Sequence, residues 1–158
     1  MTGPKPESKD ASAERDLQCF IDKFTPEIAT LARACLKKMR AKLPGAVQLV
    51  YDNYNALVVG FGPSERASEA IFSIVLYPRW VTLFFLQGAG LPDPNKLLKG
   101  SGKVVRHIVL AAAVDLDKPA IRGLMTVALN RAKMAIDPGA PGSLEIRSIS
   151  AKQRPRRP

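Results

Sequence analysis

Apolar residues repeat at helical spacing in two stretches at the start of the chain and in one stretch near its end. The first stretch begins near Ala13, the second opens at Pro26 and stops at Pro44-Gly45, and the third ends at Asp137-Pro138-Gly139. A repeat of three to four residues gives a helix a single apolar face. Thr25 and Asp117 stand where the second and third helices need N-caps. The pattern therefore predicts two N-terminal helices and one C-terminal helix.

Between the second and third helices the pattern changes to that of strands. Short apolar runs end at turn-forming residues such as Asn53, Gly62-Pro63 and Pro78-Arg79. The predicted strands cover residues 47–51, 56–61, 70–77, 80–86 and 104–110. Three short connections in succession indicate an antiparallel meander. Because the strands are gathered between helices, we expect an α+β fold in which the three helices pack on one face of an antiparallel sheet of about five strands.

The ends of the chain differ in composition from its centre. Residues 1–13 are rich in Pro, Lys, Glu and Ser, and we expect a disordered tail there. Residues 14–136 would then form the domain, and residues 137–158 a C-terminal extension. Within that extension, residues 143–150 are predicted to form either a weak additional strand or a docked segment, and residues 151–158 a disordered basic tail.

The chain is strongly basic. Its 158 residues carry a net charge of +10, and residues 17–136 alone contain 16 Lys or Arg against 8 Asp or Glu. Such an excess is compatible with a polyanionic partner, either nucleic acid or an acidic protein, and equally with a solvated lysine-rich surface. The beginning of the sequence has no apolar signal segment, and we expect a cytoplasmic protein. Cys19 and Cys35 match no zinc pattern and are expected to be reduced structural thiols.

The stretch 87–110 is the first candidate for a binding site. It holds four glycines, the only histidine and four cationic side chains. Glycines around a serine allow backbone N–H groups to point at an anion, and nearby lysines supply charge. The anion-binding residues predicted here are Lys99, Gly100, Ser101, Gly102, Lys103 and His107. On a strand, Lys103 and His107 would lie on one face. The alternative is that His107 only holds the loop through a hydrogen bond to a carbonyl or to Asp93.

The same stretch does not fit a phosphate loop of a nucleotide hydrolase. That pattern needs glycine where this chain has Leu97, and a serine or threonine where it has Val104. No Ser/His/Asp arrangement or nucleophile elbow is present either. No catalytic residues, metal ligands or cofactors are predicted from the sequence, and enzyme activity is not expected.

Two further surfaces could bind a polyanion. One is the outer face of the second helix, with the cations Arg33, Lys37, Lys38, Arg40 and Lys42. The other is a set of aromatic residues on the meander, since rings on a sheet with cations around them can stack with bases. These rings are Tyr51, Tyr54, Tyr77, Trp80, Phe84 and Phe85. Both surfaces have a structural alternative, a solvated helix face in the first case and core packing in the second.

Several segments resemble the YdhG-like domain family, a family of unknown function. They are F-I-D-K-F-T-P-E-I, L-Y-P-R-W-V-T-L-F-F and, most specifically, G-A-G-L-P-D-P-N-K-L-L-K-G-S-G-K-V-V-R-H-I, so the resemblance covers about residues 16–135. It implies a small α+β domain with helices against an antiparallel sheet. One branch of the family resembles frataxin and is described as an intracellular iron chaperone. That role needs an acidic helix ridge, whereas Arg33, Lys37 and Lys38 stand on the helix here.

Three functional hypotheses follow from the sequence. The first is a non-enzymatic cytoplasmic binding or accessory domain whose loop between Gly88 and His107 takes an anionic ligand or partner. The second is nucleic-acid association through the basic surface and the R-P-R-R-P tail. The third is a frataxin-like iron or iron–sulfur accessory protein, which the basic helices disfavour.

Overall fold

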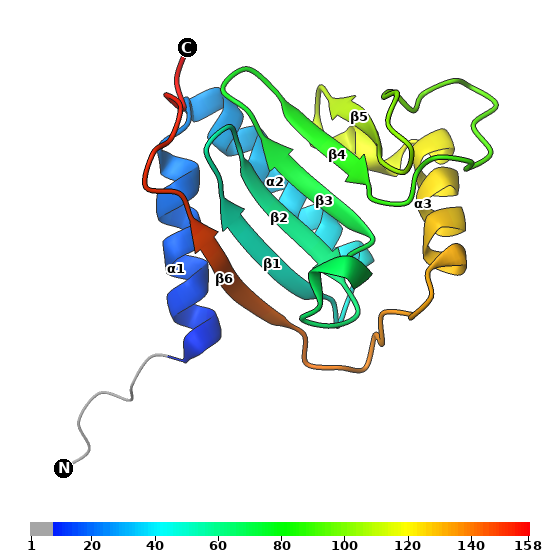
Figure 1. Cartoon of the computed structure of the whole chain (residues 1–158), viewed down its shortest axis with the longest axis horizontal. Helices are drawn as coiled ribbons and strands as arrows, with labels where there is room; N and C mark the ends of the chain where they lie inside the picture. Colours follow the sequence, from blue (N-terminus) through cyan, green and yellow to red (C-terminus); the bar gives the residue numbers. More distant parts are fainter. Residues whose placement is uncertain (1–7) are drawn as a thin grey trace.

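The computed structural model describes residues 8–158, which form three α-helices and an open six-stranded sheet (Figure 1). The helices are α1 (Lys9–Asp22), α2 (Pro26–Lys42) and α3 (Pro119–Arg131). The strands are β1 (Val47–Asp52), β2 (Leu57–Gly62), β3 (Phe72–Leu76), β4 (Val81–Phe85), β5 (Arg106–Leu110) and β6 (Ser143–Ile149). Two 3₁₀ turns, η1 (Ala67–Glu69) and η2 (Ala113–Asp117), complete the set. The predicted α+β class is confirmed, but the sheet has six strands and not five.

The strand order is β5-β4-β3-β2-β1-β6. Strands β1 to β5 form the predicted antiparallel meander. Strand β6 pairs with β1 in parallel, which makes the sheet mixed. A parallel neighbour requires a crossover connection, and here the chain passes through η2, α3 and residues 132–142 before it returns to β1. The segment 143–150 is therefore a strand for most of its length.

Helix α2 begins where the sequence predicts. Thr25 accepts a hydrogen bond from the backbone N–H of Ile28, and Pro26 occupies the first helical position. Helix α1 begins earlier than expected, at Lys9, because Ser8 caps it by accepting from the N–H of Ala11. Residues 9–13 of the predicted tail are thus helical, and residues 1–7 lie outside the described residues.

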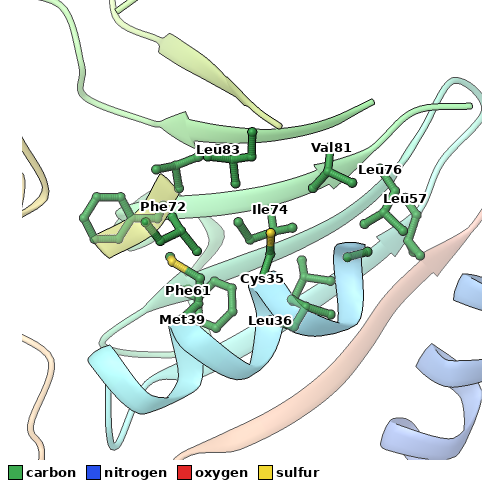
Figure 2. Packing of buried hydrophobic residues seen from close by; sticks show 14 of the residues in the cluster. Cys35, Leu36, Met39, Leu57, Phe61, Phe72, Ile74, Leu76, Val81 and Leu83 are labelled. Carbon is green, nitrogen blue, oxygen red and sulfur yellow. The ribbon is translucent and has the colours of Figure 1, made fainter. Parts of the chain in front are cut away.

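One face of the sheet carries the hydrophobic core (Figure 2). Cys35, Leu36 and Met39 of α2 point at the inward side chains of β2, β3 and β4 (Figure 2). Those strand residues include Leu57, Phe61, Phe72, Ile74, Leu76, Val81 and Leu83. Burial of this aliphatic and aromatic surface, at roughly 25 cal/mol per Å², is the main force that holds the layers together.

The opposite face of the sheet carries no α-helix within residues 8–158 (Figure 1). Only the segment around η1 crosses it, at one end. Gly62 makes this crossing possible, since a Cβ there would lie 2.9 Å from the Cα of Ala70. The sheet is therefore a two-layer structure with one face largely open.

The C-terminal segment is not the disordered tail that its composition predicts. Arg156 is 5% exposed, and its guanidinium donates to the buried carboxylate of Asp52 at 2.9 Å and lies over the ring of Phe24. Lys23 bonds the second Asp52 oxygen at 3.0 Å. Burial tends to raise the pKa of Asp52, but hydrogen bonds from Gln153, Lys23 and Arg156 outweigh it, so the pKa lies below its ordinary value. The tail is tied down by an ion pair that composition alone does not reveal.

Substitution of Arg156 by Ala is expected to destabilise the protein by about 3 kcal/mol, because it leaves the Asp52 carboxylate buried without its guanidinium partner, with Lys23 as the one remaining cation. Urea unfolding at neutral pH measures the loss. Arg157→Ala is the matched control, since Arg157 is exposed and donates only to backbone carbonyls, and it should change stability by less than about 0.5 kcal/mol. Equal effects of the two substitutions would show that the Asp52–Arg156 pair does not hold the segment.

Candidate anion-binding site

The open face of the sheet presents aromatic rings and a groove. Phe84 on β4 and His107 on β5 are directly opposite, and their rings pack together with centroids 5.3 Å apart and planes tilted by 35°. A second ring pair, Tyr77 and Trp80, closes the β3–β4 turn with centroids 6.0 Å apart. The groove between β4 and the β1–β2 turn has a volume of about 560 Å³. It is lined by Asn53, Tyr54, Asn55, Ala56, Val58, Ser73, Val75, Tyr77, Phe84 and Ser150.

Lys99 lies beside His107 at the outer edge of this face. The backbone N–H of Lys99 donates to the carbonyl of His107 at 2.8 Å, and the N–H of His107 donates back at 2.9 Å. Residues that exchange both bonds in an antiparallel pair have Cα atoms about 5.5 Å apart and side chains on the same face. The structure therefore brings two of the predicted site residues, Lys99 and His107, together next to the Phe84 ring.

The loop between Lys99 and His107 is held open by its own contacts. Arg106 donates to the carbonyls of Gly102 and Val105 at 2.5 and 2.7 Å. Gly100 adopts a φ of +119°, which favours glycine, and sits close to the His107 ring. Within residues 8–158, no hydrogen bond uses the exposed backbone N–H groups of residues 100–103. These donors are free to face an anion.

Lys103 is not where the sequence predicts it. The expected strand 104–110 is shortened to Arg106–Leu110, because residues 100–105 form the loop that Arg106 holds. Lys103 is consequently an exposed loop residue and does not share a strand face with His107. The cation that accompanies His107 on the sheet is Lys99, from the preceding limb of the loop.

Asp93 supports the same loop. Its carboxylate accepts from the backbone N–H groups of Leu97 and Leu98 at 2.9 and 2.8 Å, so it fixes the turn over residues 93–98. Within residues 8–158, no hydrogen bond joins the His107 side chain to Asp93 or to any other carboxylate. The imidazole thus lies against Phe84 and is not used to hold the loop.

The cations of α2 are mostly engaged by carboxylates. Arg33 bonds Asp22, Arg40 bonds Glu14, and both Lys38 and Lys42 bond Asp117. Of the five residues in the predicted basic helix surface, only Lys37 is exposed and has no ion pair among the described residues. These ion pairs join α2 to α1 and to η2.

Asp117 does not cap α3, and the prediction that it does so is wrong. Helix α3 starts after Lys118 with no side-chain cap, and the Asp117 carboxylate instead bonds Lys38 and Lys42 of α2.

Positive charge is left over elsewhere, around β4, β5 and the loop between them. Residues 71–110 contain five Lys or Arg and a single carboxylate, Asp93, which already accepts two backbone N–H groups. The cations are Arg79, Lys96, Lys99, Lys103 and Arg106. Part of the unbalanced charge therefore lies in the strands and loop that carry Lys99 and His107, whereas on α2 most of it is neutralised by ion pairs.

No nucleophile or carboxylate lies in hydrogen-bonding contact with the His107 imidazole within residues 8–158. Among these residues, no three His, Cys, Asp or Glu side chains gather as a possible metal site. No helix in the described part of the chain is long and apolar enough to cross a membrane.

Comparison of the chain with protein-family models, curated proteins and solved structures gave no match. The resemblance to the YdhG-like family stays a prediction from the quoted motifs. The site is therefore interpreted from its own geometry.

Sequence reasoning identified the aromatic residues but not their arrangement. The β4–β5 register was needed to assign Phe84 to the open face. This register places Phe84 opposite His107, and it leaves Phe85 in the core. Thr82, between Trp80 and Phe84 in the sequence, is one of the alternate side chains of the meander that were expected on an open, partly polar face of the sheet. It is 2% exposed, and its hydroxyl has no hydrogen-bond partner within the described residues. Its alternation with Trp80 and Phe84 was the available signal.

The ion pairs between α2 and η2 predict how stability responds to acid. Hydrogen bonds from Lys38 and Lys42 lower the pKa of Asp117 from 3.8 to about 2. A lowered carboxyl pKa contributes stability above the unfolded value and loses it as pH falls through the folded value. Urea unfolding should therefore show Asp117→Asn destabilised at neutral pH, with its difference from the parent protein disappearing between about pH 4 and pH 2.

Asp16→Asn is the control for this experiment, because Asp16 is an exposed aspartate of α1. It should track the parent protein at every pH. A difference between Asp117→Asn and the parent that is the same at pH 7 and pH 2 would contradict the role given to Asp117.

Proposed function

We propose that the protein is a non-enzymatic binding domain that recognises an anionic group at the Lys99–His107 end of its open sheet face. The observation that carries this proposal is the paired bridge between Lys99 and His107, which lies beside the Phe84 ring and next to free backbone N–H groups. Charge, directed donors and a flat apolar surface thus converge on one place.

Each component contributes to anion recognition in a different way. Lys99 supplies a point charge on a flexible stem, whereas the N–H groups of residues 100–103 supply fixed donors. His107 adds a ring nitrogen and, with Phe84, a surface for a planar group. Gly100 leaves room beside the imidazole, since its Cβ position lies 3.7 Å from Nδ1 of His107.

The surroundings favour an anion over a cation. The nearest carboxylate in the sequence, Asp93, is occupied by the backbone of Leu97 and Leu98. The positive side chains of residues 71–110 have no other acidic residue in that stretch. The α2 surface is a weaker candidate, because four of its five cations are neutralised by ion pairs.

Titration with inorganic phosphate, followed by backbone amide chemical shifts, tests the proposal. The amides of Gly100, Ser101, Gly102, Lys103 and His107 should shift together in a saturable manner. Lys99→Ala should weaken this response roughly fivefold, because it removes a charge at the site. Lys37→Ala removes the same charge from an exposed position on α2 and should leave the response unchanged.

Two results would overturn the proposal. The first is the absence of saturable shifts in residues 100–107 while other amides respond. The second is an equal loss of affinity in Lys99→Ala and Lys37→Ala, which would indicate that only the net charge matters.

A further inference from the structure

We propose that the open sheet face binds single-stranded nucleic acid, with bases stacked on its aromatic rings and backbone phosphates held by the cations at its rim. This inference rests on the proposed anion site and identifies its ligand as a phosphate of the nucleic-acid backbone. It differs from association through the α2 cations and Arg156, because most of those groups are engaged in ion pairs within the protein.

The two aromatic pairs lie on the same face of the sheet. Phe84 and Trp80 are four residues apart on β4 and its extension into the turn, so alternation places both on the side opposite the core. At about 3.3 Å per residue their positions are separated by ~13 Å. Trp80 is 47% exposed. The face thus offers two separate platforms for unpaired bases, which stack on exposed aromatic rings without regard to sequence.

The groove continues from these rings toward the other edge of the sheet. Its floor consists of small and aliphatic side chains such as Ser73 and Val75, and its far wall is the β1–β2 turn. Asn53 and Asn55 bring amide groups to that wall, and amides can bond the edges of bases. Because neighbouring strands are about 4.8 Å apart, the path from β5 to β2 is ~14 Å long.

Cations mark both ends of this path. Lys99 stands at the β5 end. At the far wall, the guanidinium of Arg154 lies 5.6 Å from the centroid of the Tyr54 ring. A strand that crosses the sheet would meet positive charge on entering and on leaving the groove. The unbalanced charge of residues 71–110 raises the potential along the same side.

The chemistry of the face favours a single strand over other polyanions. A duplex keeps its bases stacked on one another, so it cannot use exposed rings as platforms. A run of Asp and Glu offers charge but no planar rings for Trp80, Tyr77 and Phe84. Only single-stranded nucleic acid uses both the cations and the rings.

The fluorescence of Trp80, the only tryptophan in the chain, reports directly on this face. The full chain is titrated with a single-stranded oligonucleotide of about ten nucleotides, a length within the range of known single-strand sites. Base stacking should quench Trp80 in a saturable manner. The duplex of the same sequence and poly-glutamate should each leave Trp80 unquenched at the same salt concentration.

Anisotropy of the labelled oligonucleotide then tests the residues. Trp80→Ala should weaken binding roughly tenfold, whereas Met134→Ala, at an apolar residue that is 49% exposed and follows α3 in the chain, should not. Lys99→Ala should lower the slope of log affinity against log salt by about 0.7, because one phosphate contact is lost. Lys37→Ala should leave the slope unchanged.

The outcomes separate this inference from the proposed function. If phosphate shifts residues 100–107 but the oligonucleotide fails to quench Trp80, the nucleic-acid inference fails and the anion site stands. Quenching of equal strength by poly-glutamate or by the duplex would also overturn the single-strand inference and leave the anion site standing. If neither phosphate nor the oligonucleotide binds, both proposals fail.

Discussion

The rest of the structure depends on one constraint: successive side chains of each strand point alternately to the covered face and to the open face of the sheet. Leu57, Phe72 and Leu83 point toward α2, and their neighbours in sequence must point the other way. Because the helices lie on one side only (Figure 1), the outward side chains that are not covered by their neighbours on the same face, as Ser73 and Thr82 are, stay available to solvent or to a ligand. Trp80 and Phe84 belong to that set, and a core role for either would require a shift of register by one residue.

A second consequence concerns charge. Ion pairs join α2 to α1 and to η2, and Asp117 alone pairs with both Lys38 and Lys42. Each such pair removes a cation from the surface that a polyanion could use. The uniform excess of basic residues in the sequence therefore becomes an uneven distribution in space. In the stretch from β4 to β5, Asp93 is the single carboxylate, so the excess of cations there is not neutralised by ion pairs.

The sequence predicted the parts of the fold that depend on local pattern. Periodicity located the helices and the meander, and Thr25-Pro26 marked the start of α2 correctly. The features that it missed depend on contacts between distant residues. Arg156 is buried because it pairs with Asp52. The two residues are more than a hundred positions apart in the chain but adjacent in space, so a local pattern cannot reveal the pair. Strand β6 was ambiguous for the same reason, since its pairing partner β1 lies far upstream.

The candidate site illustrates the same limit at the scale of one loop. Residue types in 99–107 were sufficient to suggest anion binding, but their pairing was not. A strand from residue 104 would have placed Lys103 with His107, whereas the Arg106 guanidinium holds residues 100–105 as a loop and leaves Lys99 as the bridging partner. The glycines that loosen this loop expose its N–H groups, and the bridge keeps both ends on the sheet. A loop fixed at its ends and open at its centre suits ligand recognition, because its donors are positioned before the ligand arrives.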